Sequence, residues 1–251
     1  MRLKDRVAIV TGAAGGLGSE FSIALAREGA KIVAADLHSA EETIARIAAD
    51  GGEAIGTETD VSNGDSAQKM ADAALSAFGR IDILISNAGI LSQMMTFDQI
   101  TDEQWDHMLA VNAKGMWQCA KAVVPSMKAQ GKGKIVNISS STFYEGVPMM
   151  AHYVASKGAV LGFTRALARE LTDTGINVNA ITPGLTITPL VADQIDKPPM
   201  SEVRKHINAG RIIPRDEVPS DLSGTVVFLS SDESDFISGQ TINVDGGFRH
   251  L

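Results

Sequence analysis

Short runs of strand-forming residues alternate along the whole chain with segments of helical length, and no other feature limits the possible folds as much. The runs are Val7–Val10, Lys31–Ala35, Ala54–Thr59, Ile83–Ser86, Lys134–Ile138, Ile176–Ile181 and Thr241–Val244. Helical patterns lie between them at about Leu17–Arg27, Ala40–Ala49, Asp65–Phe78, Asp102–Met127, Tyr153–Leu171 and Asp216–Leu229. Strands separated by helices form parallel sheets. We therefore predict a doubly wound α/β fold with a seven-stranded, mainly parallel sheet and helices on both faces.

The chain has 251 residues and contains no repeat or linker that would divide it, so we predict a single domain over residues 1–251. The segment Leu185–Arg215 breaks the regular alternation and contains four prolines. Loops of this length in compact domains usually carry function. We expect a substrate lid there, and the alternative is an irregular helical excursion without a role.

Composition and charge exclude several classes of protein. The 22 basic and 30 acidic residues give a net charge of −8 without a basic run, which argues against a nucleic-acid surface. The single cysteine, Cys119, cannot form an internal disulfide. The long uncharged stretches are interrupted by polar residues, glycine or proline, and the first apolar run, Val7–Val10, is too short for a signal-peptide core. We expect a cytoplasmic protein with no membrane or nucleic-acid partner and no metal site.

A glycine-rich turn follows the first predicted strand and opens the first predicted helix. Its glycines permit positive φ angles and close backbone approach, while the free N–H groups and the dipole at the helix N-terminus attract an anion. This arrangement suits the phosphates of a dinucleotide and indicates a Rossmann fold. The residues predicted to bind are Gly12, Gly15, Gly16, Leu17 and Gly18.

Asp36 closes the second predicted strand, 18 residues after Gly18. A carboxylate at this position accepts hydrogen bonds from both adenosine ribose hydroxyls and repels a 2′-phosphate. Neither Ala14 nor the neighbours Leu37 and His38 supply an arginine to offset that repulsion. The sequence therefore favours NAD over NADP, and the alternative is an aspartate that only caps the next helix.

These residues resemble the short-chain dehydrogenase/reductase family over nearly the whole chain, including its Thr-Gly-x-x-x-Gly-x-Gly turn at Thr11, Gly12, Gly16 and Gly18. The resemblance implies further cofactor contacts at Leu37, Asp60, Val61, Asn87, Ala88, Gly89, Pro183, Gly184, Thr186 and Thr188. Pro183, Gly184 and Thr188 resemble the stretch that the family places against the nicotinamide carboxamide. Ser86 stands where the family has an asparagine, and a hydroxyl makes fewer hydrogen bonds than an amide. We expect a modest loss of stability and no loss of chemistry from this departure.

Tyr153 and Lys157 are four residues apart in a helical pattern, about 40° from each other on one face. A Lys⁺ beside a tyrosine stabilises the phenolate and lowers its pKa from about 10 toward neutrality. Such pairs are also common on exposed helices, so the spacing alone is weak evidence. The family resemblance implies that Tyr153 is the acid/base, and that Lys157 lowers its pKa and holds the nicotinamide ribose.

Two further residues complete the set that the resemblance implies. Ser140 lies 13 residues before Tyr153, at the end of a predicted strand, and would orient the substrate oxygen. Ser139 and Ser141 flank it, which leaves a shift of one residue open. Asn112 resembles the family's asparagine that supports a proton relay; the alternative is a helical asparagine bonded to a nearby carbonyl. The implied reaction is hydride transfer between NAD and a substrate carbon.

The candidate substrate wall is apolar and has no cationic clamp. Besides Ser140 it contains Leu91, Met94, Met95, Phe143, Tyr144, Met149, Met150, Leu185 and Ile187, and each methionine is equally consistent with simple packing. We predict a neutral hydrophobic or aromatic secondary alcohol or ketone as substrate, and the resemblance implies a homotetrameric alcohol dehydrogenase or carbonyl reductase. The first alternative is a 3-oxoacyl-carrier-protein reductase, against which Asp36 and the acidic charge argue. The second is a non-catalytic NAD-binding regulator.

Overall fold

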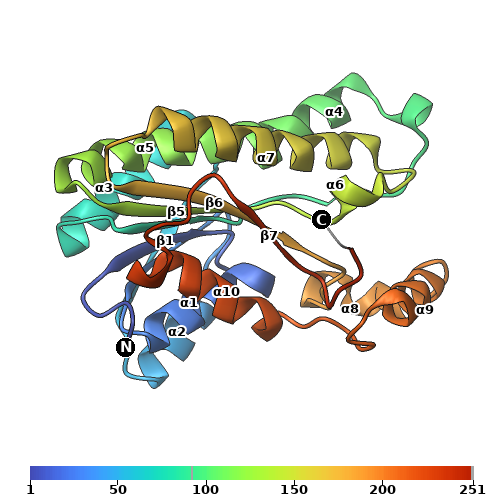
Figure 1. Ribbon diagram of the computed structural model, residues 1–251, viewed down its shortest axis with the longest axis horizontal. Helices are drawn as coiled ribbons and strands as arrows, with labels where there is room; N and C mark the ends of the chain where they lie inside the picture. Colours follow the sequence, from blue (N-terminus) through green and yellow to red (C-terminus); the bar gives the residue numbers. More distant parts are fainter. Residues whose placement is uncertain (92, 250–251) are drawn as a thin grey trace.

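Seven strands form one sheet in the computed structural model of the protein, which describes residues 1–91 and 93–249 (Figure 1). They are β1 (Val7–Thr11), β2 (Lys31–Asp36), β3 (Ala54–Glu58), β4 (Ile83–Ser86), β5 (Gly133–Ile138), β6 (Ile176–Pro183) and β7 (Thr241–Val244). Their order is β3-β2-β1-β4-β5-β6-β7, and all six pairings are parallel. The predicted α/β sheet is confirmed.

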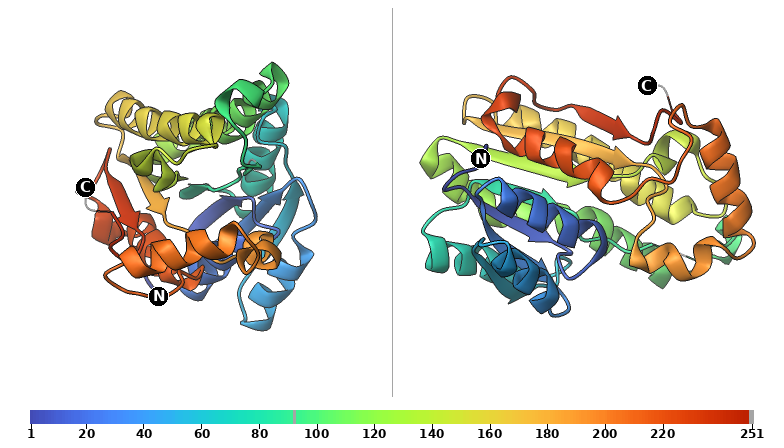
Figure 2. Two further views of the ribbon diagram at one scale, coloured as in Figure 1. Left: turned by 90° about the vertical axis from the view of Figure 1, so that its right-hand side faces the viewer. Right: turned by 90° about the horizontal axis from the view of Figure 1, so that it is seen from below.

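Helices cover both faces of this sheet (Figure 2). One layer contains α1 (Gly16–Arg27), α2 (Glu41–Ala49) and α10 (Ser220–Ser230), and the other contains α3 (Gly64–Phe78), α4 (Asp102–Leu109), α5 (Gly115–Gln130) and α7 (Ala151–Glu170). Short elements are η1 (Phe97–Gln99), the π-helical turn η2 (Ala110–Lys114), α6 (Thr142–Glu145) and η3 (Asp232–Ser234). The helices α8 (Pro189–Ile195) and α9 (Met200–Gly210) extend beyond the sheet edge.

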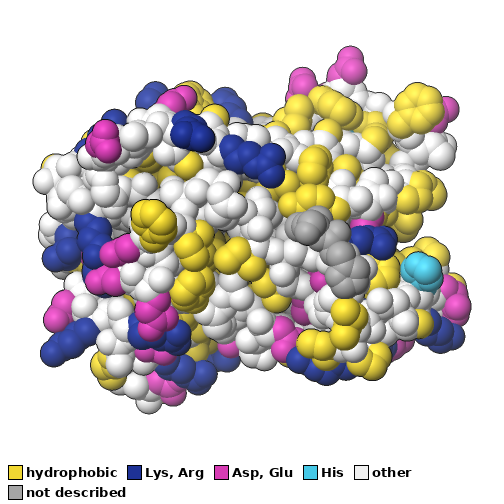
Figure 3. Space-filling view, in the orientation of Figure 1, with side chains coloured by type: hydrophobic (Ala, Val, Ile, Leu, Met, Phe, Trp, Pro, Cys, Tyr) yellow, Lys and Arg dark blue, Asp and Glu magenta, His cyan; other side chains and the backbone are white. Residues whose placement is uncertain are grey.

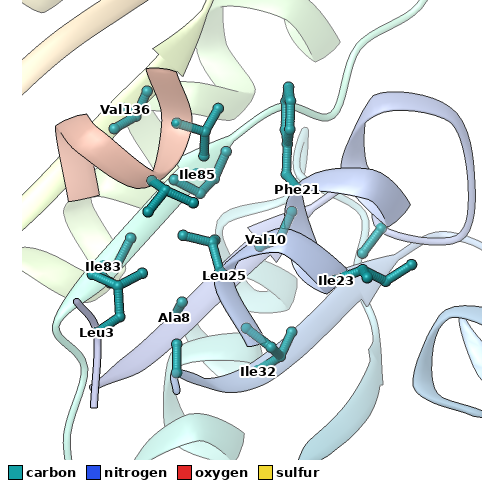
Figure 4. Close-up of a cluster of buried hydrophobic side chains, with 14 of the residues drawn as sticks. Leu3, Ala8, Val10, Phe21, Ile23, Leu25, Ile32, Ile83, Ile85 and Val136 are labelled. Carbon is teal, nitrogen blue, oxygen red and sulfur yellow. The ribbon is translucent and has the colours of Figure 1, made fainter. Parts of the chain in front are cut away.

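The strands are apolar on both sides because both sides face helices. Along β1, Val7 and Ile9 enter one core cluster while Ala8 and Val10 enter the other, as the period of two in a strand requires. Figure 4 shows the second of these clusters, where Phe21 of α1 packs with Val10 and Ile85. The central strands are therefore rigid supports for the residues that follow them.

The helix predicted over Asp102–Met127 is interrupted. After α4 the chain makes the π-helical turn η2, whose closing bond runs from the Gly115 N–H to the Ala110 carbonyl, and α5 then continues. Single π turns inside helices are frequent at functional sites. Asn112, the candidate catalytic residue, lies in this turn.

One helix boundary near the predicted lid also differs from the prediction. The helix predicted from Asp216 begins at Ser220, because the backbone of Glu217 pairs with Thr186 and Ile187 and Pro219 follows. The predicted lid segment, Leu185–Arg215, contains α8 and α9, and its role as a lid stays a prediction. In the described parts of the chain, none of the helices has the length and apolar character that crossing a membrane requires.

The replacement of an asparagine by Ser86 affects a second residue besides Ser86 itself. Its hydroxyl has no hydrogen-bond partner among residues 1–91 and 93–249, and neither has the Oδ1 atom of Asn137, its register partner on β5. The Asn137 side chain is held only through its Nδ2 atom, which donates to the Thr164 hydroxyl at 3.0 Å. Two buried oxygen atoms at the centre of the sheet thus have no hydrogen-bond partner among the described residues.

The strand order reverses between β1 and β4, since the chain continues from β1 to one side and from β4 to the other. In open α/β sheets this switch point forms a crevice at the carboxyl ends of the strands, where ligands bind. The carboxyl ends of β1, β2, β4, β5 and β6 carry most of the predicted site residues.

Candidate active site at the carboxyl edge of the sheet

The glycine-rich turn is too closely packed for side chains at two of its positions. Gly12 has φ +69°, and a Cβ atom there would lie 2.8 Å from Nδ2 of Asn87. A Cβ atom on Gly18 would lie 2.0 Å from the Gly12 carbonyl oxygen. By contrast, a Cβ on Gly15 would meet open space, and α1 begins there without a side-chain cap. The backbone N–H groups at this helix end are therefore accessible to an anion.

Thr11 and Asn87 hold the turn against the end of β4. The Thr11 hydroxyl accepts hydrogen bonds from the N–H groups of Asn87 and Ala88, both at 3.0 Å, and Asn87 Nδ2 donates to the Thr11 carbonyl at 2.9 Å. The predicted cofactor residues Asn87, Ala88 and Gly89 thus lie beside the glycine turn.

Asp36 ends β2 facing the same turn. Its two carboxylate oxygens accept the N–H groups of Ala14 and His38, each at 2.9 Å. These bonds fix the carboxylate at the position expected for the adenosine ribose. At the end of β3, Asp60 instead accepts hydrogen bonds from the N–H and hydroxyl of Ser62.

Tyr153 and Lys157 lie on α7, where Lys157 is 5% exposed and its Nζ lies 5.8 Å from the centre of the Tyr153 ring. Lys157 Nζ donates to the Ile138 carbonyl at 3.0 Å. The three serines after β5 have different partners. Ser139 donates to the Lys157 carbonyl at 2.8 Å, and Ser141 donates to Glu145 at 3.2 Å. Ser140 is the serine whose hydroxyl acts on Tyr153, where it favours a lower pKa. This distribution favours Ser140 as the serine that shares substrate with Tyr153.

Burial governs the proton affinities of this pair. It lowers the pKa of Lys157 to about 8, because the ammonium group is removed from water. It raises the pKa of Tyr153, while the hydrogen bond from Ser140 acts in the opposite direction. The net shift of the Tyr153 pKa in the protein alone is therefore upward, and the lowering expected from Lys157 stays a prediction for the occupied site. Tyr153 is a phenol at neutral pH, and its deprotonation depends on what else enters the site.

Asn112 is fully buried; its Nδ2 donates to Met108 Sδ in the preceding helical turn at 3.0 Å, and its other hydrogen bonds reach across the site. Its Oδ1 accepts the Ile90 N–H at 2.8 Å, and its Nδ2 donates to the Ile90 carbonyl at 3.0 Å and to the Ser156 hydroxyl at 3.1 Å. A Cβ atom on Gly89 would lie 3.1 Å from Asn112 Oδ1 and 3.5 Å from Lys157 Nζ. Gly89 therefore permits the close approach of the two candidate residues.

The predicted substrate wall is only partly enclosed. Leu91, Met94, Phe143 and Met149 are exposed, and Met95, Tyr144, Met150, Leu185 and Ile187 are half-buried. An apolar hollow of about 440 Å³ includes Met149 but otherwise lies among Thr96, Phe97, Gly146, Val147, Pro148, Ala151 and Val154. On α7, Ala151 and Val154 lie roughly 160° and 100° around the helix from Tyr153. This hollow is therefore separate from the catalytic face. Figure 3 shows an indentation at the edge of the molecule, between the segment of α8 and α9 and the elements above it.

The segment after β6 connects the glycine turn with the catalytic serines. The Pro183 carbonyl accepts the Ser141 N–H at 2.9 Å, and Thr188 lies 3.8 Å from where a Cβ on Gly16 would be. The Thr186 hydroxyl, by contrast, donates to Glu217 at 2.7 Å, so any cofactor contact of Thr186 falls to its backbone. Glu217 and its partner Arg211 were not predicted, because a lone glutamate and a lone arginine in an irregular segment give no sequence signal.

These features fit a dinucleotide. An uncapped helix end with open space at Gly15 suits two phosphates, the fixed carboxylate of Asp36 suits a ribose, and Lys157 lies where the other end of the molecule would reach. A family model described as "Enoyl-(Acyl carrier protein) reductase" matches residues 12–249. The chain belongs to the short-chain dehydrogenase/reductase family.

Individual members of this short-chain dehydrogenase/reductase family are similar to the chain over almost its full length. A 3-oxoacyl-[acyl-carrier-protein] reductase of Synechocystis sp. is 36% identical, with 98% of this chain and 97% of that protein covered. The structure of a putative short-chain alcohol dehydrogenase from Sinorhizobium meliloti has a TM-score of 0.92 at 34% identity, covering 98% and 97%. That of a putative NAD(P)-dependent gluconate 5-dehydrogenase from Beutenbergia cavernae, with NADP bound at low occupancy, has a TM-score of 0.91 at 35% identity, covering 98% and 97%. The chain is thus an oxidoreductase of this family with a site for a nicotinamide cofactor.

Proposed function

We propose that the protein interconverts a neutral, apolar secondary alcohol and the corresponding ketone, with NAD as its preferred cofactor. The observation that carries this proposal is the convergence of three groups at one point. The Ser140 hydroxyl, the Tyr153 phenol and the buried Lys157 amine meet where β5 and α7 approach the crevice of the sheet.

Each of these groups has a role that follows from its contacts. When bound, the dinucleotide supplies or accepts the hydride. Tyr153 as the phenol donates its proton to a ketone oxygen, and as the phenolate it takes the proton of an alcohol. Ser140 is oriented by Thr142, whose hydroxyl donates to it at 2.9 Å, and it donates to the same substrate oxygen. Protonated Lys157 stabilises the Tyr153 phenolate that forms during reduction.

Asn112 has a supporting role in this proposal. Because it is bonded to both backbone groups of Ile90 and to Ser156, it fixes the wall of the site opposite α7. That wall leaves Lys157 close to Gly89, where a water could connect the ammonium group with solvent. A proton relay through this position would restore Tyr153 after each turnover.

The preference for NAD rests on Asp36. Its carboxylate is fixed by two backbone N–H groups and cannot turn away from a 2′-phosphate without losing both bonds. Like charges at hydrogen-bond distance repel strongly where solvent is partly excluded. The NADP in the related Beutenbergia cavernae structure makes the opposite preference the main alternative.

The second candidate function is reduction of a 3-oxoacyl thioester, and the names of the relatives favour it. The Synechocystis sp. relative and several staphylococcal ones are 3-oxoacyl-[acyl-carrier-protein] reductases. The carbonyl chemistry is the same, so the catalytic residues do not separate the two functions. Asp36 and the net charge of −8 weigh against an acidic carrier protein as partner. The expected cytoplasmic homotetramer remains a prediction under either function.

The test is a nicotinamide absorbance assay with NAD⁺, NADP⁺ and their reduced forms. The panel contains 1-phenylethanol and other secondary alcohols, their ketones, and acetoacetyl-coenzyme A as a model thioester. We expect turnover of an aryl or alkyl alcohol with NAD⁺ that is lost in Tyr153→Phe. Turnover of the thioester alone, with NADPH, would replace the first function by the second. Tight NADH binding without turnover of any compound would favour the non-catalytic regulator.

A further inference from the structure

The turn after β6, Gly184–Thr188, lies between the two halves of the site. Thr188 reaches the glycine turn at Gly16, and the preceding Pro183 is bonded to Ser141 beside the catalytic serine. A dinucleotide with its phosphates at Gly15 and its reactive end near Tyr153 must pass along this turn. The position of the turn therefore affects how firmly the reactive end is held.

Two backbone bonds define the edges of the turn. The Gly184 N–H donates to the Val244 carbonyl at 3.1 Å, and the Ile187 N–H donates to the Glu217 carbonyl at 2.8 Å. Thr186 and Glu217 form an isolated parallel bridge. The turn thus lies between the end of β7 on one side and residue 217 on the other.

The side chain of Glu217 contacts the turn at Thr186 and Gly184. It is 4% exposed; Oε1 accepts the Thr186 hydroxyl at 2.7 Å, and Oε2 accepts Nη2 of Arg211 at 3.0 Å. A Cβ atom on Gly184 would lie 2.7 Å from Oε2 and 3.0 Å from that Nη2 atom. The carboxylate therefore lies directly against the backbone of the turn, which cannot move toward it.

The guanidinium of Arg211 is also buried and fully hydrogen-bonded. Its side chain is 2% exposed. Its Nε donates to the Asp245 carbonyl, Nη1 donates to Asn208 Oδ1 and the Arg215 carbonyl, and Nη2 donates to the Leu185 carbonyl and to Glu217. These are all five donors of a guanidinium. Glu217 is the single anionic acceptor among these partners, so the buried positive charge depends on it.

We propose that Glu217, paired with Arg211, is a positioning residue that holds the Gly184–Thr188 turn against the nicotinamide end of the dinucleotide. The inference rests on the proposed dinucleotide function and deepens it. The buried Arg211–Glu217 ion pair, which lies outside the catalytic set, thereby determines the affinity for the nicotinamide end of the cofactor. The adenosine end, held by the glycine turn and Asp36, is independent of it.

The ion pair also makes this affinity depend on pH. Burial, with a smaller contribution from Asp245, raises the pKa of Glu217 to about 7, although the hydrogen bonds from Thr186 and the Gly184 N–H and the charge of Arg211 act in the opposite direction. Arg215 and the Arg204–Asp216 pair are the other charges near this segment. As pH falls through 7, Glu217 takes a proton and Arg211 loses its counter-charge. The turn is then held less firmly, and the nicotinamide end binds more weakly at lower pH.

The test compares NADH, which has the nicotinamide, with ADP-ribose, which lacks it. Dissociation constants are measured at about pH 6 and about pH 8 for the wild type and for Glu217→Gln. We expect Glu217→Gln to weaken NADH binding at the higher pH by about ten-fold, the scale of one lost charge-assisted bond. We expect ADP-ribose binding to be unchanged and the pH dependence of NADH binding to disappear. The matched control is Glu202→Gln, which breaks an exposed ion pair on α9 without contact with the turn.

Thr186→Val adds a variant that keeps the ion pair and removes one bond to Glu217, and it should weaken NADH but not ADP-ribose. Equal losses for both ligands in Glu217→Gln would overturn the proposal, because they would indicate a general structural role. NADH binding unchanged in Glu217→Gln would overturn it as well. If the wild type binds neither ligand, the proposed dinucleotide function fails and this inference fails with it, whereas tight wild-type binding separates the two.

Discussion

The two halves of the sheet hold their functional groups in different ways. In the half formed by β1, β2 and β3, the site consists of glycine backbone, an open helix end and one carboxylate fixed by N–H groups. In the half formed by β4 to β7, side chains hold side chains and turns. Ser139 holds the backbone of Lys157, Asn112 holds the segment at Ile90, and Glu217 holds the turn after β6.

This difference predicts different sensitivities. The nucleotide half should fail when a glycine gains a side chain, because backbone atoms cannot move aside. The catalytic half should fail when a polar side chain is truncated, because a buried partner then loses a hydrogen bond that water cannot replace.

The largest effect is expected in the catalytic half, from the three serines after β5. Ser140→Ala removes the hydroxyl bonded to Tyr153 and should lower kcat roughly 100- to 1,000-fold. Ser141→Ala removes only the bond to Glu145 and should leave kcat nearly unchanged. Steady-state rates of both variants decide the matter, and a greater loss in Ser141→Ala would shift the assignment by one residue.

The glycine turn gives the next effect. Gly18→Ala places a methyl group against the Gly12 carbonyl and should destabilise the protein by about 1–3 kcal/mol while impairing NADH binding. Gly15→Ala meets only open space, so its thermal stability should match the wild type while its affinity for NADH falls. Thermal melts and NADH titrations measure both. A Gly15→Ala variant with wild-type affinity would show that the phosphates bind elsewhere.

Asp36 tests the nucleotide half by charge instead of shape. Asp36→Asn keeps one carbonyl oxygen as an acceptor, gives up the bond from either Ala14 N–H or His38 N–H because its NH2 group cannot accept, and removes the charge that repels a 2′-phosphate. The ratio of kcat/KM for NAD⁺ to that for NADP⁺ should fall about ten-fold, equivalent to one lost unfavourable contact of about 1.4 kcal/mol. An unchanged ratio would mean that Asp36 serves only to fix the turn.

The pH dependence of ketone reduction tests the catalytic pair. Tyr153 has a raised pKa and stays protonated through neutral pH, so the acid is available throughout that range. Lys157 is positively charged below about 8 and loses its charge above that pH, and with it the stabilisation of the phenolate. The rate of reduction at saturating NADH should be level up to about pH 8 and then decline. A decline at the same pH in Lys157→Met would assign it to another group.

The smallest effect concerns the Ser86 hydroxyl and Asn137 Oδ1, the buried atoms without hydrogen-bond partners at the centre of the sheet. Ser86→Asn introduces an amide that can donate to Asn137 Oδ1 on the neighbouring strand. The free energy of unfolding should rise by about 1 kcal/mol, the scale of one buried hydrogen bond. Denaturant titration measures the change. A less stable Ser86→Asn variant would show that the position next to Asn137 has no room for an amide.

The same contrast explains what the sequence could predict. Strands such as Val7–Val10 and helices such as Leu17–Arg27 follow from apolar periodicity, and the glycine turn and Asp36 follow from local spacing. The π-helical turn at Asn112 could not be predicted, because it depends on bonds to Ile90, 22 residues earlier. Nor could the Arg211–Glu217 pair, whose partners come from three separate segments. The upward effect of burial on the pKa of Tyr153 could not be predicted either, because spacing gives its distance from Lys157 but not its burial.

The most direct test of the account follows the hydrogen itself. A ketone that the enzyme reduces is incubated with NADH deuterated at both positions of the nicotinamide C4, and the alcohol is examined by mass spectrometry and NMR. The account predicts one deuterium on the carbinol carbon of every product molecule. It also predicts that Tyr153→Phe forms this labelled product far more slowly than the wild type does. An alcohol without deuterium at that carbon would contradict direct transfer at the Ser140, Tyr153 and Lys157 site.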